Sequence, residues 1–183
     1  MLTKLLHFIA RIRFATKPLN DTKKLASKAW QATGNDPQLK LRSPFFLKGW
    51  YFVAMKVDFQ SEQGQIAKLY PDYGHGFSED TAFILPHRRH KPTYKVIYLS
   101  KRPKTLRFDP VEDQIDFTLQ HFKIYRITQQ EAQRVLLNPS WHEKERLLAL
   151  EDLNLEDIEA FRETFFSELD TAVLSSGNTS RAT

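Results

Sequence analysis

The chain of 183 residues contains no cysteine. This absence excludes disulfide bonds and every metal or redox site built on thiolates, and it suits a reducing compartment. The sequence also has no apolar run near the ~20 residues that cross a bilayer as a helix. Arg11 and Arg13 interrupt the apolar start of the chain, and no small-residue cleavage site follows them. We therefore expect neither a spanning helix nor an export signal.

Signatures of catalysis are missing as well. The sequence has no GxSxG, P-loop, GxGxxG or HExxH pattern, and its 6 histidines are scattered. We expect a binding protein without a cofactor, and an enzyme acting on a glycan is a third hypothesis. Asp72, Glu79, Asp80 and Asp109 lie near predicted loop ends, where carboxylates bind Ca²⁺ or form turns. No loop has a dense run of such ligands, so we interpret them as turn residues and expect no metal site.

Charge is abundant but unevenly distributed. The net charge is +5, yet residues 1–30 hold seven bases and one acid, whereas residues 129–170 hold four bases and eleven acids. Such asymmetry is typical of a basic segment that meets an anionic surface or docks on the acidic end of its own chain. The 14 phenylalanines supply large apolar side chains for a core.

Residues 1–43 are predicted to form a basic N-terminal helix and a linker. Within residues 2–14, an apolar stripe at helical spacing consists of Leu2, Leu5, Leu6, Ile9 and Ile12. This helix has three interpretations: it docks on the protein itself, lies on an anionic membrane face, or binds a partner. Residues 15–42 are polar and predict a linker or an irregular wrap.

Residues 44–127 change to a period of two and predict an antiparallel, jelly-roll-like β-sandwich. The predicted strands are Trp50–Phe59, Ile66–Tyr70, Thr81–Leu85, Tyr94–Leu99, Leu106–Asp109 and Ile115–Ile127. The alternation of the last strand shifts phase near His121, which is typical of a bulge. The fold class is therefore mainly β, with α-helices at both ends.

Residues 128–174 are acidic and predict helices. Thr128 with Glu131, and Ser140 with Glu143, have the spacing of capping boxes, and Asn154 precedes a third apolar stripe. Residues 175–183 are small and polar and predict a disordered tail.

Two groups of residues are candidates for binding. Aromatic rings beside strand ends can stack on a sugar face or a base, and a carboxylate accepts hydrogen bonds from hydroxyls. The corresponding candidates are Tyr70, Asp72, Tyr73, His75 and Phe77, although Trp50 and Phe77 are also interpreted as core residues. The second group is the basic loop His87, Arg88, Arg89, His90 and Lys91, between two prolines. It is either a solvated loop or a phosphate or sulfate site, because neighbouring cations disfavour a metal.

Five short segments occur in order along the middle of the chain. They are Gly49-Trp50-Tyr51, Leu69-Tyr70 with Asp72 and Gly74, Gly76-Phe77-Ser78-Glu79, Leu106-Arg107-Phe108-Asp109-Pro110, and Phe117-Thr118-Leu119 with Phe122-Lys123-Ile124. Together they resemble a bacterial β-sandwich region found ahead of glycosyltransferase domains in polysaccharide-synthesis proteins. The resemblance implies a jelly-roll accessory module that contacts saccharide or positions the transferase. The residues after Ile127 do not resemble a glycosyltransferase domain, so catalysis is not implied.

Two functional hypotheses follow. The first is a non-catalytic accessory or binding module in bacterial surface-glycan synthesis, located in the cytoplasm or at the inner membrane face, with a saccharide or a glycosyltransferase as partner. The alternative is a peripheral membrane or polyanion-binding protein that uses the basic N-terminus and the Arg88–Lys91 loop. Nucleic acid is disfavoured as a partner because no recognition helix or aromatic RNA-binding motif is present. The sequence leaves the oligomeric state open.

Overall fold

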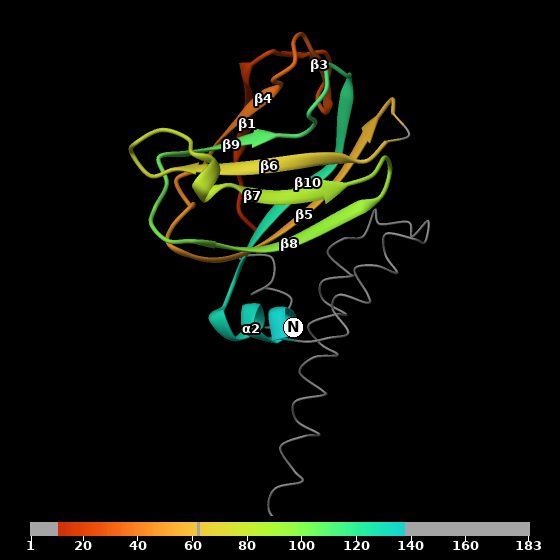
Figure 1. Cartoon of the computed structure of the whole chain (residues 1–183). Coiled ribbons are helices and arrows are strands. Elements are labelled where there is room, and N and C mark those ends of the chain that lie inside the picture. The colour runs from red at the N-terminus through yellow and green to blue at the C-terminus, as the bar shows by residue number, and fades with distance from the viewer. Residues whose placement is uncertain (1–10, 62, 138–183) are drawn as a thin grey trace, which may run out of the picture.

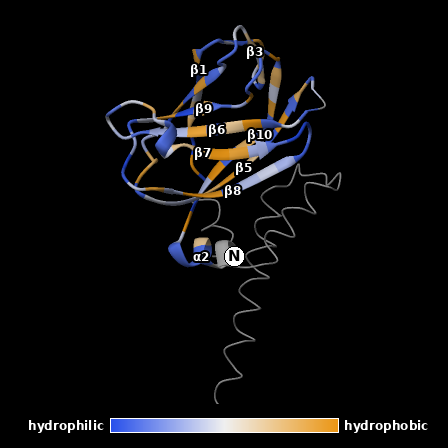
Figure 2. Cartoon of the chain, viewed as in Figure 1, coloured by the Kyte–Doolittle hydropathy of each residue, from blue (hydrophilic) through white to orange (hydrophobic). Residues whose placement is uncertain are grey.

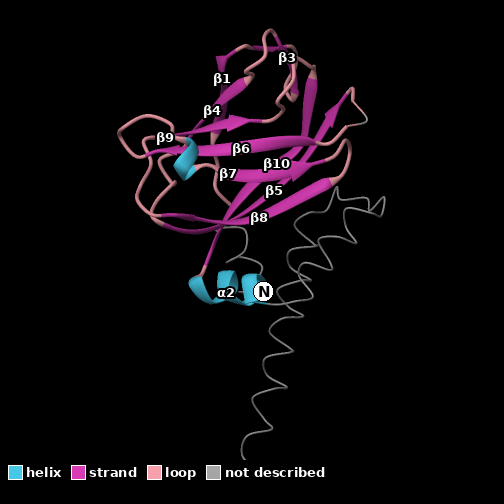
Figure 3. Ribbon diagram, viewed as in Figure 1, coloured by secondary structure: helices cyan, strands magenta, loops and turns pink. Residues whose placement is uncertain are grey.

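The computed structural model describes residues 11–61 and 63–137, which form two facing β-sheets and one α-helix (Figure 1). The strands are β1 (Ala15–Asn20), β2 (Thr22–Lys24), β3 (Ala29–Ala32), β4 (Gln38–Arg42), β5 (Gly49–Phe59), β6 (Gln65–Asp72), β7 (Phe83–His87), β8 (Pro92–Leu99), β9 (Thr105–Asp109) and β10 (Phe117–Ile127). The helical elements are η1 (Glu79–Thr81) and α2 (Gln129–Leu137), and strands make up most of the described chain (Figure 3).

Each sheet contains five strands. One sheet has the order β1-β4-β9-β6-β7 and is called the β9 sheet; the other has the order β2-β3-β10-β5-β8 and is called the β10 sheet. All the pairings between these strands are antiparallel. The prediction of a mainly β protein with two antiparallel sheets is therefore confirmed. Its finer assignment as a jelly roll stays a prediction.

The core lies between the sheets and follows from the period of two. On β5, Val53, Met55 and Val57 point inward and are buried, and on β9 the inward side chains are Leu106 and Phe108. Figure 2 shows that β6 and β7 also carry hydrophobic residues. Burying one such side chain contributes roughly 1.5–3 kcal/mol, so this alternation is the main source of stability.

The linker interpretation of residues 15–42 is wrong. This segment forms β1 to β4, of which β4 pairs with β9 and β3 pairs with β10, so both sheets depend on it. Trp30, Leu39 and Leu41 are buried in the core, while the lysines of the segment point to solvent or lie half-buried. An antiparallel sheet with one wet face needs only every second residue to be apolar, and short strands of that kind read as polar sequence. The predicted boundary at residue 43 does not separate a linker from the sandwich.

The predicted N-terminal helix does not include residues 11–14. The backbone N–H of Ile12 donates to the carbonyl of Ile124 at 2.8 Å, and Arg11 forms a β-bridge with Tyr125. Ile12 is buried in the core rather than on a helical stripe. Residues 11 and 12 pair with β10 instead of forming a helix, because β3 pairs with β10 only at Phe117 and Thr118 and leaves the rest of that edge open. The other members of the stripe, Leu2, Leu5, Leu6 and Ile9, lie outside the described residues.

Two local predictions are confirmed. The pairing of β10 with β5 shifts register between Leu119 and His121, where the phase of the sequence changes. At the start of α2, the Thr128 N–H donates to Glu131 Oε2 at 2.7 Å and the Glu131 N–H donates to Thr128 Oγ1 at 3.1 Å. This reciprocal pair is a capping box.

The helices expected after Ser140 and Asn154 and the tail 175–183 lie outside the described residues. Within the described ranges, no helix has the length and apolarity needed to cross a membrane.

The third predicted strand begins and ends later than expected. Residues 79–81 form η1, and β7 continues through Pro86 to His87. Proline is tolerated there because β7 is the edge strand of the β9 sheet and needs only one hydrogen-bonded neighbour. His87 therefore belongs to a strand and is buried, which corrects its assignment to a solvated loop.

Candidate functional site

The outer face of the β9 sheet carries polar side chains at adjacent positions on four strands. The inward side chains of β4 and β9 include Leu41 and Phe108, so the alternate residues point away from the core. The register places Arg107 opposite Lys40 on one side and opposite Tyr70 on the other. Lys17 of β1 lies opposite Lys40. Side chains separated by up to 90 positions in the sequence thus become neighbours.

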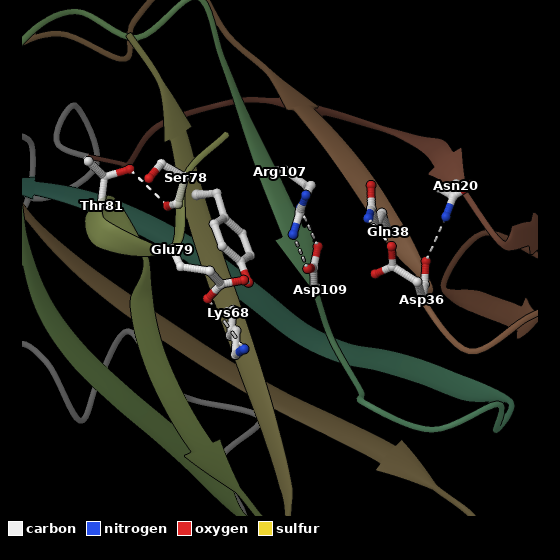
Figure 4. A network of polar contacts seen from close by, with 10 residues as sticks. Asn20, Asp36, Gln38, Lys68, Ser78, Glu79, Thr81, Arg107 and Asp109 are labelled. Atoms are coloured by element: carbon white, nitrogen blue, oxygen red, sulfur yellow. Dashed lines mark hydrogen bonds and ion pairs between the residues drawn. The ribbon is translucent and has the colours of Figure 1, made fainter. Parts of the chain in front are cut away.

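A band of hydrogen-bonded side chains crosses this face, and we call it the polar strip (Figure 4). Its members are Asn20, Asp36, Gln38, Lys68, Glu79, Arg107 and Asp109. The strip runs across β1, β4, β9 and β6, with the turn of η1 at one end and Asn20 with the loop before β4 at the other.

An ion pair occupies the centre of the polar strip. Arg107 donates to Asp109 through Nε at 3.0 Å and through a terminal nitrogen at 2.8 Å, and 18% and 13% of the two side chains are exposed. Burial raises the pKa of Asp109 to about 6, although the Arg107 guanidinium opposes that rise, and the nearby charge of Asp36 adds to it. The bidentate geometry holds both planar groups in one orientation.

Tyr70 lies beneath this pair rather than in solvent. The residue is 2% exposed, and the Arg107 guanidinium carbon lies 4.0 Å from the ring centroid, a cation–π contact. Its hydroxyl donates to Glu79 Oε1 at 2.8 Å, while Lys68 Nζ lies 3.5 Å from Glu79 Oε2. Burial raises the pKa of Tyr70, and the hydrogen bond from Tyr70 lowers the pKa of Glu79. Tyr70 therefore supports the strip and offers no ring for stacking, contrary to the expectation of an exposed aromatic residue.

The far end of the polar strip comes from the N-terminal strands. Asn20 Nδ2 donates to the carbonyl of Asp36 at 3.2 Å, and Gln38 Nε2 donates to Asp36 Oδ2 at 2.5 Å. The Asp36 N–H donates to Asp21 Oδ2 at 3.3 Å. These bonds fix the loop before β4, so the carboxylate and the two amides form one connected group.

The remaining predicted residues of the loop after β6 have mixed roles. Asp72 Oδ1 accepts hydrogen bonds from the N–H groups of Gly74 at 2.7 Å and Gly76 at 3.0 Å, and these bonds lower the pKa of Asp72. Gly74 and Gly76 have φ of 112° and 86°, which side-chain-bearing residues rarely adopt. The Tyr73 hydroxyl accepts a hydrogen bond from the Ser100 N–H at 3.1 Å. Asp72 and Tyr73 thus shape the loop itself.

Two of the predicted loop residues retain accessible surface. His75 is exposed, and Phe77 is half-buried with its ring centroid 5.4 Å from the Arg107 guanidinium carbon. Phe77 therefore adjoins the polar strip, whereas the core interpretation placed it in the interior. Trp50, the other expected core ring, is also half-buried and packs on Tyr98 with their centroids 4.8 Å apart.

The basic residues 87–91 divide into two groups. Arg89 Nε and His90 Nε2 each lie 3.1 Å from Asp58 Oδ1, so one carboxylate engages both. His87, Arg88 and Lys91 instead contribute to the lining of a cavity. The structure therefore does not bring all five residues around one anion.

The arrangement of the polar strip suits binding. It offers carboxylate oxygens as acceptors, amide, guanidinium and ammonium groups as donors, and the Phe77 ring as an apolar plane. Among residues 11–61 and 63–137, no group of three or more His, Asp or Glu is placed to hold a metal ion. What this surface can do chemically is form many hydrogen bonds to an elongated hydroxylated molecule.

Local sequence patterns do not predict the polar strip. They mark Asp109 and Glu79 as loop carboxylates, and they place both residues and Arg107 in the segments that resemble a known β-sandwich region. The same patterns predict a linker at Asn20 and Gln38. The usable signal was the alternation of buried leucines with Gln38, Lys40 and Arg107, which marks one solvated face, but only strand order shows which faces adjoin.

No protein-family model and no curated protein sequence matches the chain. Among solved structures, it is similar to a family 29 carbohydrate-binding module from Piromyces equi, with 14% identity and a TM-score of 0.44 over 64% of this chain and 83% of that one. It is also similar to the low-affinity xylan-binding module CBM86 from Roseburia intestinalis, with 14% identity and a TM-score of 0.38 over 66% and 98% of the two chains.

A third similar structure is the carbohydrate-binding module CBM6cm-2 of Cellvibrio mixtus lichenase 5A in complex with cellotriose. It shares 11% identity and a TM-score of 0.37 over 64% of this chain and 89% of that one. Because these TM-scores are below 0.5, the fold assignment depends on the strand order and register given above.

Proposed function

We propose that the chain is a non-catalytic saccharide-binding module and that the polar strip is its binding surface. The observation that carries the proposal is a row of three hydrogen-bonded groups of polar side chains across the outer face of the β9 sheet, bordered by the Phe77 ring. The similarity to solved structures, with TM-scores of 0.44 and lower, does not carry it.

Sugar hydroxyls donate and accept hydrogen bonds, and the polar strip has partners for both. The carboxylates of Asp36 and Glu79 accept, while the side chains of Asn20, Lys68 and Arg107 donate. These groups are already held by hydrogen bonds to one another, so little side-chain freedom is lost when a ligand binds. Phe77 supplies a plane against which the apolar face of a pyranose ring packs.

The shape of the surface favours an extended glycan over a small enclosed ligand. The strip crosses four adjacent strands from β1 to β6, and at about 4.8 Å between strands this spans about 14 Å. That length accommodates consecutive sugar units of one chain. An open sheet face contacts only one side of such a chain, which predicts modest affinity for each unit.

A finer proposal places this binding in bacterial surface-glycan synthesis. It follows from the ordered segments between Gly49 and Ile124 that resemble the region ahead of glycosyltransferase domains. In this proposal the module holds a glycan or a glycosyltransferase in the cytoplasm or at the inner membrane face.

Calorimetric titration of the full chain with cellohexaose, xylohexaose and mannohexaose tests saccharide binding. We expect at least one to bind, and we expect Phe77→Ala and Glu79→Gln to weaken that binding about tenfold or more, the effect of losing about 1.4 kcal/mol. Phe45→Ala and Glu112→Gln are the matched controls, because both residues are exposed and neither belongs to the polar strip. Absence of binding at millimolar sugar, or equal losses in the controls, refutes the assignment.

A further inference from the structure

A second surface feature lies away from the polar strip, where the two sheets adjoin. The edge strand of the β9 sheet is β7 and that of the β10 sheet is β8, and a cavity of about 320 Å³ opens between them and the start of β6. This volume is within the range of sites for small organic ligands. Ile66, Pro86 and Pro92 give the cavity an apolar wall.

The charged side chains among the described lining residues are positive. Arg88 and Lys91 contribute to it, and no aspartate or glutamate is among the described residues around the cavity. The Lys91 N–H donates to the carbonyl of Arg88 at 3.1 Å, so the two cations lie on one turn. Arg88 is exposed and forms no ion pair with any described residue, whereas the neighbouring Arg89 is paired with Asp58.

We propose that this cavity binds a small organic anion. A phosphate or carboxylate group is held by Arg88 and Lys91, and an apolar body packs on Ile66, Pro86 and Pro92. Guanidinium and ammonium groups bind such anions through charge-assisted hydrogen bonds. The cavity does not include any member of the polar strip, so this site is independent of saccharide binding.

Titration of the ¹⁵N-labelled full chain with phenyl phosphate, followed by NMR, tests the proposal. We expect a dissociation constant below 1 mM, by order of magnitude, with shifts of the backbone N–H signals of residues 64–66, 87–91 and 93. Inorganic phosphate tests whether the anion alone suffices, and benzyl alcohol tests the apolar body alone. Both should bind at least about tenfold more weakly. Equal binding of inorganic phosphate overturns the apolar part of the proposal, and absence of phenyl phosphate binding overturns the whole.

The charge of the site is tested by substitution on the surface. Arg88→Gln should weaken phenyl phosphate binding about tenfold or more and leave saccharide binding unchanged. Arg102→Gln, an exposed arginine outside the cavity, is the matched control and should bind as the parent chain does. Unaltered binding by Arg88→Gln refutes the site. Saturation with a bound hexasaccharide should not change phenyl phosphate affinity, which separates this outcome from that of the proposed function.

Discussion

Asp109 offers a test of whether burial or ion pairing dominates the centre of the polar strip. Its carboxylate is almost fully buried and accepts two hydrogen bonds from Arg107. Burial favours the protonated acid, and the guanidinium favours the carboxylate. Burial has a larger effect than the ion pair in this structure, so the pKa of Asp109 rises from 3.8 to about 6. The substitution that isolates this effect is Asp109→Asn.

The expected size and sign follow from proton linkage. Between pH 3.8 and about 6, the folded protein keeps the proton on Asp109 while the unfolded chain releases it, because the folded pKa is the higher one. The free energy of unfolding contributed by Asp109 is therefore fully present below pH 3.8 and is lost as the pH rises through 6. At about 1.4 kcal/mol for each pKa unit, the loss is at most about 3 kcal/mol.

Urea unfolding of the parent chain and of Asp109→Asn at a series of pH values measures this loss. The parent should lose up to about 3 kcal/mol relative to the variant as the pH rises through the linkage window. Arg107 keeps its charge throughout, so the loss of its partner in the variant shifts the whole curve without changing its slope. Asp80→Asn, at an exposed position, corrects for the removal of one negative charge. A relative stability that rises with pH would show that the ion pair dominates, and the reasoning about burial would be wrong.

Two further predictions concern the scaffold. Phe108→Ala should lower the free energy of unfolding by about 3–5 kcal/mol, because the ring is fully buried and stacks on Phe122 with centroids 4.2 Å apart. A loss below about 1 kcal/mol in urea unfolding would contradict this packing. Thr128→Ala should reduce stability by about 1 kcal/mol by removing the capping bond to Glu131, and hydrogen exchange in α2 as slow as in the parent would contradict the role of that cap.

The sequence identified the elements whose signal is local. The alternation in residues 50–59 and 115–127, the phase change near His121 and the Thr128–Glu131 cap all depend on neighbours within a few positions. The structure has each of them, although β10 begins at Phe117. The same local patterns do not predict the strands within residues 15–42, because those strands are short and have one solvated face. Short strands of that kind provide too few apolar positions to distinguish a strand from a linker.

The candidate sites depended on contacts that no local pattern contains. Tyr70 reads as an accessible ring in the sequence, but Arg107, from a neighbouring strand 37 positions later, covers it. His87 reads as part of a basic loop, but edge pairing of β7 carries it into the interior beside Pro110. Asn20 and Asp36 become part of one surface with Asp109 because β1 and β4 pair in a particular register.

The amino-acid sequence by itself determined that the middle of this chain forms strands with one apolar face, because a period of two places alternate side chains on opposite sides of extended backbone. Which strands pair, and therefore which polar side chains share the outer face of the β9 sheet, was decided only by the tertiary structure. The reason is that antiparallel register joins residues far apart along the chain, and its free energy comes from the core on the other side of the sheet.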